Sequence, residues 1–459
     1  MSLTNSSVKT FNIESFIDRQ KVSAYQWVIL GLCFLIVAAD GFDTAAAGFI
    51  APAIAKDWGL TRFALGPLLS AALIGSVLGA LISGPLADKI GRKRVLAVSV
   101  LVFGVLTLAC AKAGSLQELT FLRLVSGIGL GAAMPNATTM VSEYMPKKHR
   151  ALLVNIMFCG FTLGASAGGF AAAALIPAFG WQSIFLVGGV VPFLLALVLF
   201  AWLPESVRFM VVNSWPTEKI NMVLGRIAGK AMAEKHFTIG ETANQGRNSP
   251  VALILSKGFR SGSLLLWVTY FMGLLVYYLM TSWLPTLMKD GGMSLQQASL
   301  ITALFPLGGG LGAIVCGLLM DRVNAHRVVA FTYVLAGVFI WCVGQSVGNT
   351  LFVGLLTFLA GSCMAGAQIS MPVLAAAFYP TNGRASGVAW MLGIGRIGGI
   401  VGAFAGAVML QAGFGIEAIL QVLAVPVFVA AGALLLKNHL AKRRIAFDSI
   451  AREPHSETN

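Results

Sequence analysis

The sequence predicts an all-α membrane protein whose twelve transmembrane helices form two six-helix bundles. Three observations support this fold class. Of the 459 residues, 57% are hydrophobic and only 11% are charged, whereas a water-soluble surface needs about 25% charged residues. Twelve apolar runs approach or exceed the ~20 residues that a helix needs to cross a bilayer. Motifs from the first half of the chain also recur in the second half.

The predicted spans lie at 25–50, 63–86, 94–113, 116–142, 151–177, 182–203, 260–288, 295–319, 327–347, 350–378, 384–411 and 416–437. The predicted parts are a cytoplasmic N-terminal segment (1–24), a first bundle (25–203), a central cytoplasmic loop (204–259), a second bundle (260–437) and a cytoplasmic tail (438–459). The first apolar run is longer than the core of a signal peptide and contains two aspartates. We therefore expect it to remain as the first span.

The distribution of basic residues predicts the orientation in the membrane. The chain carries 32 Lys and Arg and a net charge of +14. The segments assigned to the cytoplasm hold 26 of these residues, whereas the opposite loops hold only Lys56, Arg62, Lys112 and Lys289. By the positive-inside rule, both termini therefore lie in the cytoplasm. The basic charge reflects topology and contact with lipid headgroups, and we expect no nucleic-acid partner.

Two pairs of similar segments indicate an internal duplication. GPLADKIGRKRV at 84–95 resembles GLLMDRVNAHRV at 317–328, and a run that begins at Arg150 resembles one that begins at Arg384. The separations within the two pairs are nearly equal, 233 and 234 residues. Because both copies have the same predicted orientation, the repeat is parallel, with its axis along the membrane normal. Two such bundles could rock about a central site.

The cysteines give no sign of a disulfide or a metal centre. All six lie in apolar stretches, and no two form a Cys-x-x-Cys pair. We interpret them as small residues that face the core or the lipid. The spans also contain no grouping of a nucleophile with a base or of metal ligands, so the sequence does not indicate an enzyme.

Four formal charges lie well inside the predicted spans: Asp40, Asp43, Arg123 and Arg396. An isolated charge there costs at least about 2.5 kcal/mol, so these residues need partners or a function. Counted along the helices, Asp40 and Arg123 both fall in the outer half of the membrane, which allows Arg123 to pair with an aspartate of the first span. The two aspartates share a helical face, and close carboxylates raise each other's proton affinity. We therefore predict that Asp40, Asp43 and Arg123 couple a proton.

Arg396 is predicted to lie near the membrane midplane, among glycines, in a half of the chain without an intramembrane acid. A permanently charged guanidinium binds a carboxylate well through its planar fork. We therefore favour an anion-binding role over a purely structural pair with Asp43. Aromatic and polar side chains of other spans are predicted to complete the site. The candidate substrate-binding residues are Arg396, Asp43, Tyr270, Tyr277, Phe158, Phe161, Gln368 and Trp390.

The loop after the second predicted span, GPLADKIGRKR at 84–94, places an acid at a helix end before a tight turn and several cations. Glycine permits the turn, and the aspartate can bind a helix N-terminus or an arginine. This loop resembles the signature loop of the major facilitator superfamily, and its second copy at 317–328 lacks the glycine of the turn. The resemblance implies a gating role for Gly84, Asp88, Gly91, Arg92, Asp321, His326 and Arg384.

The most specific string is Asp40-Gly-Phe-Asp43. It resembles the DGxD motif of the aromatic acid:proton symporter family, and the similarity covers nearly all of residues 15–435. The resemblance is strongest to bacterial transporters of 4-hydroxybenzoate and protocatechuate. It implies proton-coupled uptake of such an aromatic carboxylate across the bacterial inner membrane, driven by the proton gradient without a cofactor. We expect a monomer whose partners are the substrate, protons and the lipid bilayer.

Several alternatives remain open. The substrate could be another organic anion, such as gallate, vanillate or a chlorinated phenoxyacetate. An exporter is less favoured, because the fifth predicted span reads FCGFTLGASAGG and lacks the proline of drug–proton antiporters. The sequence PESVRF at 204–209 resembles another marker of the superfamily that is also common in sugar porters. It therefore discriminates less between the alternative substrates. A membrane sensor of aromatic acids would have only the central loop and the short tail with which to bind a partner.

Overall fold

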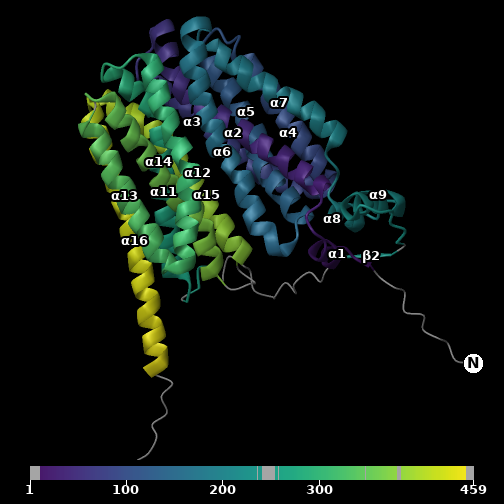
Figure 1. Ribbon diagram of the computed structural model, residues 1–459. Helices are drawn as coiled ribbons and strands as arrows, with labels where there is room; N and C mark the ends of the chain where they lie inside the picture. The colour runs from purple at the N-terminus through teal and green to yellow at the C-terminus, as the bar shows by residue number, and fades with distance from the viewer. Residues whose placement is uncertain are drawn as a thin grey trace, which may run out of the picture. The chain divides into compact units, whose positions relative to one another are not determined.

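The computed structural model describes residues 11–234, 236–239, 254–256, 258–346, 348–379 and 384–450, and most of them are helical. Within these ranges, twelve long helices follow one another. They are α2 (Ala24–Asp57), α3 (Leu65–Ile90), α4 (Arg92–Cys110), α5 (Leu116–Tyr144), α6 (Lys147–Phe179), α7 (Gln182–Trp202), α11 (Arg260–Asp290), α12 (Leu295–Arg322), α13 (Ala325–Gln345), α14 (Thr350–Phe378), α15 (Arg384–Gln411) and α16 (Ile416–Ile450). Figure 1 shows them in chain order by colour.

Eleven of the twelve helices are long and apolar enough to cross a membrane. The exception is α5, whose sequence contains Arg123, two glutamates and many small polar residues. Its 29 residues still exceed the ~20 that a span needs. The predicted all-α fold of twelve spans is therefore confirmed, and the lower hydropathy of α5 reflects the polar groups that it carries.

Local sequence signals set the beginnings of several helices. Ser115 accepts a hydrogen bond from the backbone N–H of Glu118 at the start of α5. Ser294 and Gln297 form a reciprocal capping box at the start of α12. Asn349 caps α14 in the same way as Ser115 caps α5. Each cap satisfies a backbone N–H that has no partner within its own helix.

The chain forms two compact units. The first contains the described residues of Met1–Ala46, Ala71–Ala171 and Ala178–Asn244, and the second contains those of Ala47–Ser70, Ala172–Pro177 and Gln245–Asn459. Helix α2 therefore belongs to both units, because it passes from the first to the second between Ala46 and Ala47. The two units are described separately below.

In the first unit, α4 packs against both α5 and α7. Small residues bring other backbones into contact: Gly164 of α6 faces Ala38 of α2, and Gly75 of α3 faces Leu124 of α5. In each case a Cβ on the glycine would collide with the carbonyl oxygen of the facing residue. The pairs α2–α6 and α3–α5 therefore depend on close helix contact through small residues, as is common in membranes.

The second unit repeats this arrangement helix for helix. Its main packing pairs are α11–α15, α12–α14, α13–α14 and α13–α16. They correspond to α2–α6, α3–α5, α4–α5 and α4–α7 of the first unit. The duplication that the sequence predicts is thus present in the packing as well.

Individual contacts repeat with the same separation. Gly398 of α15 meets the carbonyl of Phe271, as Gly164 meets that of Ala38. Gly308 of α12 meets the carbonyl of Phe358, which is the counterpart of the Gly75–Leu124 contact. Every one of these residues is displaced from its counterpart by 233 or 234 positions. The α3–α5 and α12–α14 contacts lie outside the segments whose similarity is visible in the sequence.

A small layer of short elements covers one end of the first unit. It contains β1 (Phe11–Asn12), α1 (Ile13–Arg19), α8 (Val207–Val212), α9 (Thr217–Ala228) and β2 (Phe237–Thr238). Strands β1 and β2 pair in parallel and so join the N-terminal segment to the central loop. Figure 1 shows α1, α8, α9 and β2 close together. The central loop is therefore partly structured, although its sequence indicated only that it does not span the membrane.

The apolar faces of α1 and α9 hold this layer in place. Ile13 and Ile17 of α1 and Leu224 of α9 are buried in one hydrophobic cluster with residues of the long helices. The cluster also contains Tyr144, the last residue of α5, and Leu203, which directly follows α7. Burial of apolar surface thus anchors the N-terminal segment and the central loop to the bundle.

Candidate functional site

A buried ion pair joins α2 to α5 in the first unit. The guanidinium of Arg123 donates to the carboxylate of Asp43 over 2.7 Å and to the Asp43 carbonyl over 3.0 Å. The two side chains are 1% and 0% exposed. The pairing that the helix positions allowed is therefore present, and the aspartate involved is Asp43. A buried charge-assisted pair of this kind is short and directional.

Two further groups complete the surroundings of this pair. Thr107 of α4 donates its hydroxyl to the second carboxylate oxygen of Asp43 over 3.0 Å. The Arg123 guanidinium also lies 5.7 Å from the centre of the Phe185 ring of α7, within the range of a cation–π contact. The site thus draws on four helices. Sequence reasoning did not identify Thr107 or Phe185, because neither stands in a recognisable motif.

Each residue of the Asp40–Asp43 string has its own environment. Asp40 is buried and accepts a hydrogen bond from Thr44 over 3.2 Å. Gly41 faces the backbone of Phe161 in α6 so closely that any Cβ would overlap it. The ring of Phe42 lies against Gly188 of α7. The glycine of the motif is therefore needed for close packing, and it places the two acids beside the α2–α6 contact.

The second unit contains a chain of buried hydrogen bonds that includes two predicted substrate-binding residues, Gln368 and Tyr270. Tyr333 of α13 donates to the side-chain carbonyl of Gln368 over 2.7 Å. The amide of Gln368, in α14, donates to the backbone carbonyl of Tyr270 in α11 over 3.2 Å. These bonds fix the orientation of Gln368. Sequence reasoning missed Tyr333, because it placed no substrate contact on the ninth span.

Arg396 is half-buried on α15. The ring of Tyr270 lies against the neighbouring Gly395, and Arg396 is within electrostatic range of Tyr270. Arg396 and Gln368 are thus both placed near Tyr270. The structure brings three of the predicted substrate residues together in one unit.

The other predicted aromatic residues lie in different surroundings. Tyr277 is buried and packs against Phe305 of α12, with ring centres 5.6 Å apart. Its hydroxyl has no hydrogen-bond partner in the described part of the chain. Trp390 is 45% exposed and stacks on Trp267 at 5.9 Å.

Phe158 and Phe161 are half-buried against the hydrophobic core of the first unit. The backbone of Phe161 also forms the contact with Gly41. Both residues therefore contribute to packing, whatever further role they have.

The predicted gating loop between α3 and α4 is held by Glu205, which follows α7. One Glu205 carboxylate oxygen accepts the backbone N–H groups of Arg92, Lys93 and Ser206, over 2.8, 3.1 and 2.9 Å. An acid at a helix N-terminus satisfies unpaired N–H groups and interacts favourably with the helix dipole. Gly91 has a φ of +100°, and a Cβ there would also strike the Glu205 carboxylate. The loop glycine and the motif at 204–209 thus form one structure.

Side chains of the same region extend this network. Arg92 pairs with Asp88 over 2.8 Å and with Glu143 over 3.6 Å. Glu143 accepts a hydrogen bond from the hydroxyl of Ser206. The hydroxyl of Tyr144 donates to the Glu205 carbonyl over 2.6 Å. Glu143 and Glu205 carry much of this network, although sequence reasoning assigned neither a role.

The second copy of the loop, between α12 and α13, is built differently. Asn324 occupies the position that corresponds to Gly91 and caps α13 with its side chain. The Lys437 ammonium lies 2.7 Å from Nε2 of His326. The first copy is thus held by a buried acid, whereas a buried lysine contacts the second.

The remaining residues predicted to act in gating lie in open surroundings. Asp321 and Arg384 are exposed. A Cβ on Gly84 would meet no described atom within 4 Å. The glycine at this position is therefore not required by close packing, in contrast to Gly91.

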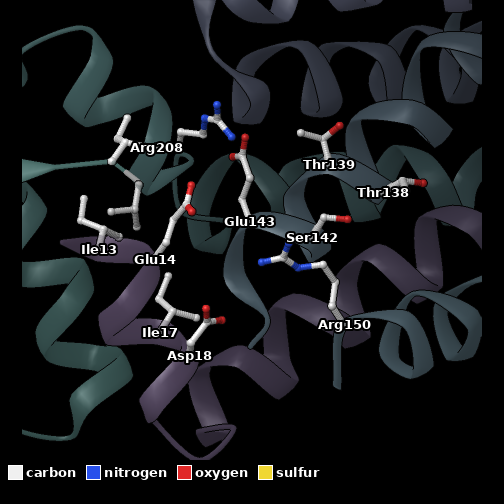
Figure 2. Close-up of a pocket in the computed structure, with 12 residues that line it drawn as sticks. Ile13, Glu14, Ile17, Asp18, Thr138, Thr139, Ser142, Glu143, Arg150 and Arg208 are labelled. Atoms are coloured by element: carbon white, nitrogen blue, oxygen red, sulfur yellow. The ribbon is translucent and has the colours of Figure 1, made fainter. Parts of the chain in front are cut away.

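A cavity of about 270 Å³ lies under α1 in the first unit. It is lined by Glu14 and Asp18 of α1, Glu143 of α5, Arg150 of α6 and Arg208 of α8, together with hydroxyl and apolar side chains. Figure 2 shows the charged ends of Glu143 and Arg208 side by side. The cavity shares no residue with the predicted substrate-binding set. It therefore belongs to the layer that covers the end of this unit.

A duplicated bundle of membrane-spanning helices with a buried ion pair is an architecture typical of secondary transporters. The family model described as Major Facilitator Superfamily matches residues 33–298 and 266–448. The chain belongs to the major facilitator superfamily.

Relatives with named substrates resemble the chain over nearly its whole length. The 4-hydroxybenzoate transporter PcaK of Pseudomonas putida is 53% identical over 435 residues, which cover 95% of this chain and 97% of the relative. A gallate transporter of Pseudomonas putida is 47% identical and covers 94% of this chain and 96% of its own length.

Solved structures share the fold at low sequence identity. The crystal structure of a D-xylose-proton symporter has a TM-score of 0.68 at 15% identity and covers 90% of this chain and 97% of its own. An inward-facing, occupied bacterial homologue of the lysosomal transporter Spinster has a TM-score of 0.67 at 17% identity, with coverages of 91% and 98%. Both show that the chain has the fold of a membrane transporter.

Proposed function

We propose that this protein takes up a hydroxylated benzoate together with a proton, and that 4-hydroxybenzoate is the first candidate substrate. The observation that carries the proposal is the 53% identity to a 4-hydroxybenzoate transporter over 95% of the chain. The 47% identical relative is named for gallate, which is also a benzoate with ring hydroxyls. A carboxylate on a hydroxylated ring is thus the chemistry common to both names.

Arg396 is the proposed partner of the substrate carboxylate. It lies half-buried beside Gly395, where a glycine leaves room for the ring of Tyr270. A guanidinium stays charged in any accessible pH range and can hold a carboxylate with two parallel hydrogen bonds. Arg396 is also within electrostatic range of Tyr270, whose backbone carbonyl accepts the buried amide of Gln368. A carboxylate on Arg396 would therefore lie close to groups whose orientation is already fixed.

Tyr277 is the proposed partner of a ring hydroxyl. Its own hydroxyl is buried and has no hydrogen-bond partner among the described residues. An unpaired buried hydroxyl costs free energy, and a substrate hydroxyl could remove that cost. Tyr277 lies two helical turns from Tyr270 on α11, or about 10 Å along the axis. A substrate that extends along α11 from Arg396 would direct its ring hydroxyl toward Tyr277.

Asp40 is the proposed proton carrier, and Asp43 the residue that couples it to the helices. The Asp43 carboxylate accepts hydrogen bonds from both Arg123 and Thr107. Its negative charge is therefore paired where α2, α4 and α5 meet. Asp40 lies one turn away, is buried, and accepts a hydrogen bond from Thr44. A change of charge at Asp40 would therefore act directly beside the ion pair.

Uptake into proteoliposomes under an imposed inward proton gradient tests the reaction. We expect radiolabelled 4-hydroxybenzoate to accumulate with the gradient and to equilibrate only when a protonophore collapses it. Accumulation that persists without the gradient would contradict symport. Asp40→Asn should lose accumulation and retain exchange of labelled for unlabelled substrate.

Two variants test the proposed contacts with substrate. Arg396→Ala should abolish binding of 4-hydroxybenzoate, and wild-type affinity in this variant would place the carboxylate elsewhere. Tyr277→Phe should raise KM for 4-hydroxybenzoate but leave KM for benzoate unchanged, because benzoate has no ring hydroxyl. An equal change for both substrates would contradict the proposed contact. Gallate as a competitor shows how many ring hydroxyls the site accepts.

We further infer that both termini lie in the cytoplasm and that the protein works as a monomer. The orientation is supported by the 26 basic residues that fall in the segments assigned to that side. A fluorescent protein fused to the C-terminus should fluoresce, whereas alkaline phosphatase fused there should be inactive. Light scattering in detergent measures the molar mass and would reveal a dimer.

A further inference from the structure

The ends of α2 and α3 in the second compact unit carry an unassigned group of charges. Residues 47–70 belong to that unit, and their small residues pack on α11 and α15. A Cβ on Gly48 would strike the backbone of Thr281, and one on Gly66 would crowd the side chains of Phe404 and Ala407. This packing brings the turn between α2 and α3 to the end of α11.

An ion pair links the turn between α2 and α3 to the end of α11. Arg62, between α2 and α3, meets Asp290 at the end of α11 through a single nitrogen–oxygen contact of 2.6 Å. Their side chains are 34% and 35% exposed. The Lys289 ammonium donates to the carbonyl of Pro52 over 3.3 Å. A partly exposed pair of this kind contributes little to stability, so a competing carboxylate has little free energy to overcome.

The helix ends and the turn around this pair carry three cations, Lys56, Arg62 and Lys289, and two acids, Asp57 and Asp290, so their net formal charge is +1. Lys56 and Arg62 both lie near enough to Lys289 for their charges to repel it, and Asp290 is near enough to attract it. These three cations are three of only four in the loops predicted to face outward. The fourth, Lys112, belongs to the first unit. On a face that is otherwise poor in basic residues, such a cluster creates a local field that attracts anions.

We propose that Lys56, Arg62 and Lys289 form an anion-attracting approach site on the outer face. There the carboxylate of an arriving aromatic acid replaces Asp290 on Arg62. The ligand class is a small organic monocarboxylate. Arg62 suits this exchange, because a guanidinium can bind a carboxylate through two of its nitrogens. Asp290 contacts only one nitrogen of Arg62. The replacement would also release the contact between residue 62 and the end of α11. This inference rests on the proposed uptake of aromatic acids.

The two members of the ion pair supply the decisive test. If Arg62 binds the substrate carboxylate, Arg62→Gln removes the binding group. Asp290→Asn instead removes the carboxylate that competes with the substrate for Arg62. Initial rates of 4-hydroxybenzoate uptake into intact cells should therefore show opposite changes. We expect KM to rise about threefold in Arg62→Gln and to fall about twofold in Asp290→Asn, as for one charge added or removed near a solvated anion. If the pair only holds the helices together, both variants break the same contact, and KM changes in the same direction.

Neutral variants of the lysines extend the test. Lys56→Gln and Lys289→Gln should raise KM about twofold and weaken its dependence on salt concentration, because added salt screens exposed charges. Lys112→Gln is the matched control, since it removes one outward-predicted cation that is not part of the cluster. An equal rise of KM in Lys112→Gln would overturn the proposal in favour of a general effect of surface charge.

The outcomes separate this inference from the proposed function. If wild-type cells take up 4-hydroxybenzoate but Arg62→Gln and Asp290→Asn shift KM in the same direction, only the approach site is refuted. If wild-type cells show no saturable uptake of any benzoate, the proposed function fails and the approach site fails with it. Measurement of each variant's amount in the membrane ensures that KM is compared between folded transporters.

Discussion

The buried pair of Asp43 and Arg123 permits a quantitative prediction. Both side chains are almost fully buried, and the shortest distance between their charged atoms is 2.7 Å. Two unit charges about 4 Å apart attract each other by about 4 kcal/mol at an effective dielectric constant of ~20. Loss of one partner from a buried pair costs about 3–5 kcal/mol, because the other charge remains buried without compensation. We therefore expect Asp43→Asn to reduce the free energy of unfolding by about 3–5 kcal/mol.

Removal of both charges should cost less than the sum of the two single removals. The double variant Asp43→Asn/Arg123→Met leaves no uncompensated charge, and its methionine fills much of the volume of the arginine side chain. We expect the double variant to recover about 2–3 kcal/mol relative to the sum of the single losses, a coupling typical of residues in direct contact. Unfolding of the detergent-solubilised protein by SDS, followed by circular dichroism, measures all four members of this cycle.

Asp40 supplies the matched control on the same helix. Asp40→Asn should cost less stability than Asp43→Asn, because an asparagine carbonyl can still accept the hydroxyl of Thr44. Additive losses in the cycle, with a coupling below about 0.5 kcal/mol, would refute the reasoning. The double variant should also fail to accumulate substrate even where it is stable, and normal accumulation would contradict its proposed role in coupling.

Three further predictions concern thermal unfolding in detergent, monitored by tryptophan fluorescence. Gly41→Ala should destabilise by about 1–3 kcal/mol because its Cβ overlaps the α6 backbone, whereas Gly31→Ala, with open space around it, should be neutral or stabilising by up to about 1 kcal/mol. Glu205→Ala should cost about 1–2 kcal/mol, because three backbone N–H groups lose their acceptor. Tyr333→Phe should cost about 1–3 kcal/mol and raise KM, because the buried carbonyl of Gln368 loses its donor.

Specific outcomes would count against each of these predictions. Equal effects of alanine at 31 and 41 would mean that the α2–α6 contact tolerates a methyl group. Full stability of Glu205→Ala would show that the N-terminus of α4 finds other acceptors. An unchanged KM in Tyr333→Phe would limit that residue to packing and exclude a role in positioning Gln368.

Much of the fold could be predicted because the membrane imposes simple rules. Apolar length and the 233-residue repeat indicated twelve helices in two copies, and both features are present in the structure. The α3–α5 contact escaped prediction because helix packing depends on which small residues face each other. A glycine-rich stretch does not show from sequence alone which neighbouring helix its glycines face. Helix α2's division between the two compact units escaped prediction for the same reason.

The candidate site could be predicted only in part. Arg123 and Asp43 were found because an intramembrane charge is costly and needs a partner. Thr107 and Tyr333 were missed, because a hydroxyl inside an apolar helix gives no signal in the sequence. Glu205 was noted only as part of the motif at 204–209, without a role. Their importance comes from atoms supplied by other helices. The roles of the site residues in proton coupling, substrate binding and gating remain predictions, and the variants above test them.

The repeated packing has a consequence for how the two copies diverged. At the positions of the second copy that correspond to Asp43 and Arg123 stand Val276 and Thr357, both buried. After a duplication, each copy inherits the same scaffold, but selection needs only one of them to keep a given charge. The two copies therefore carry different buried polar groups on the same scaffold: the first has the Asp43–Arg123 pair, and the second has the Tyr333–Gln368 hydrogen bond. Transfer of Asp and Arg to positions 276 and 357 would measure whether the scaffold of the second copy also accepts a buried ion pair.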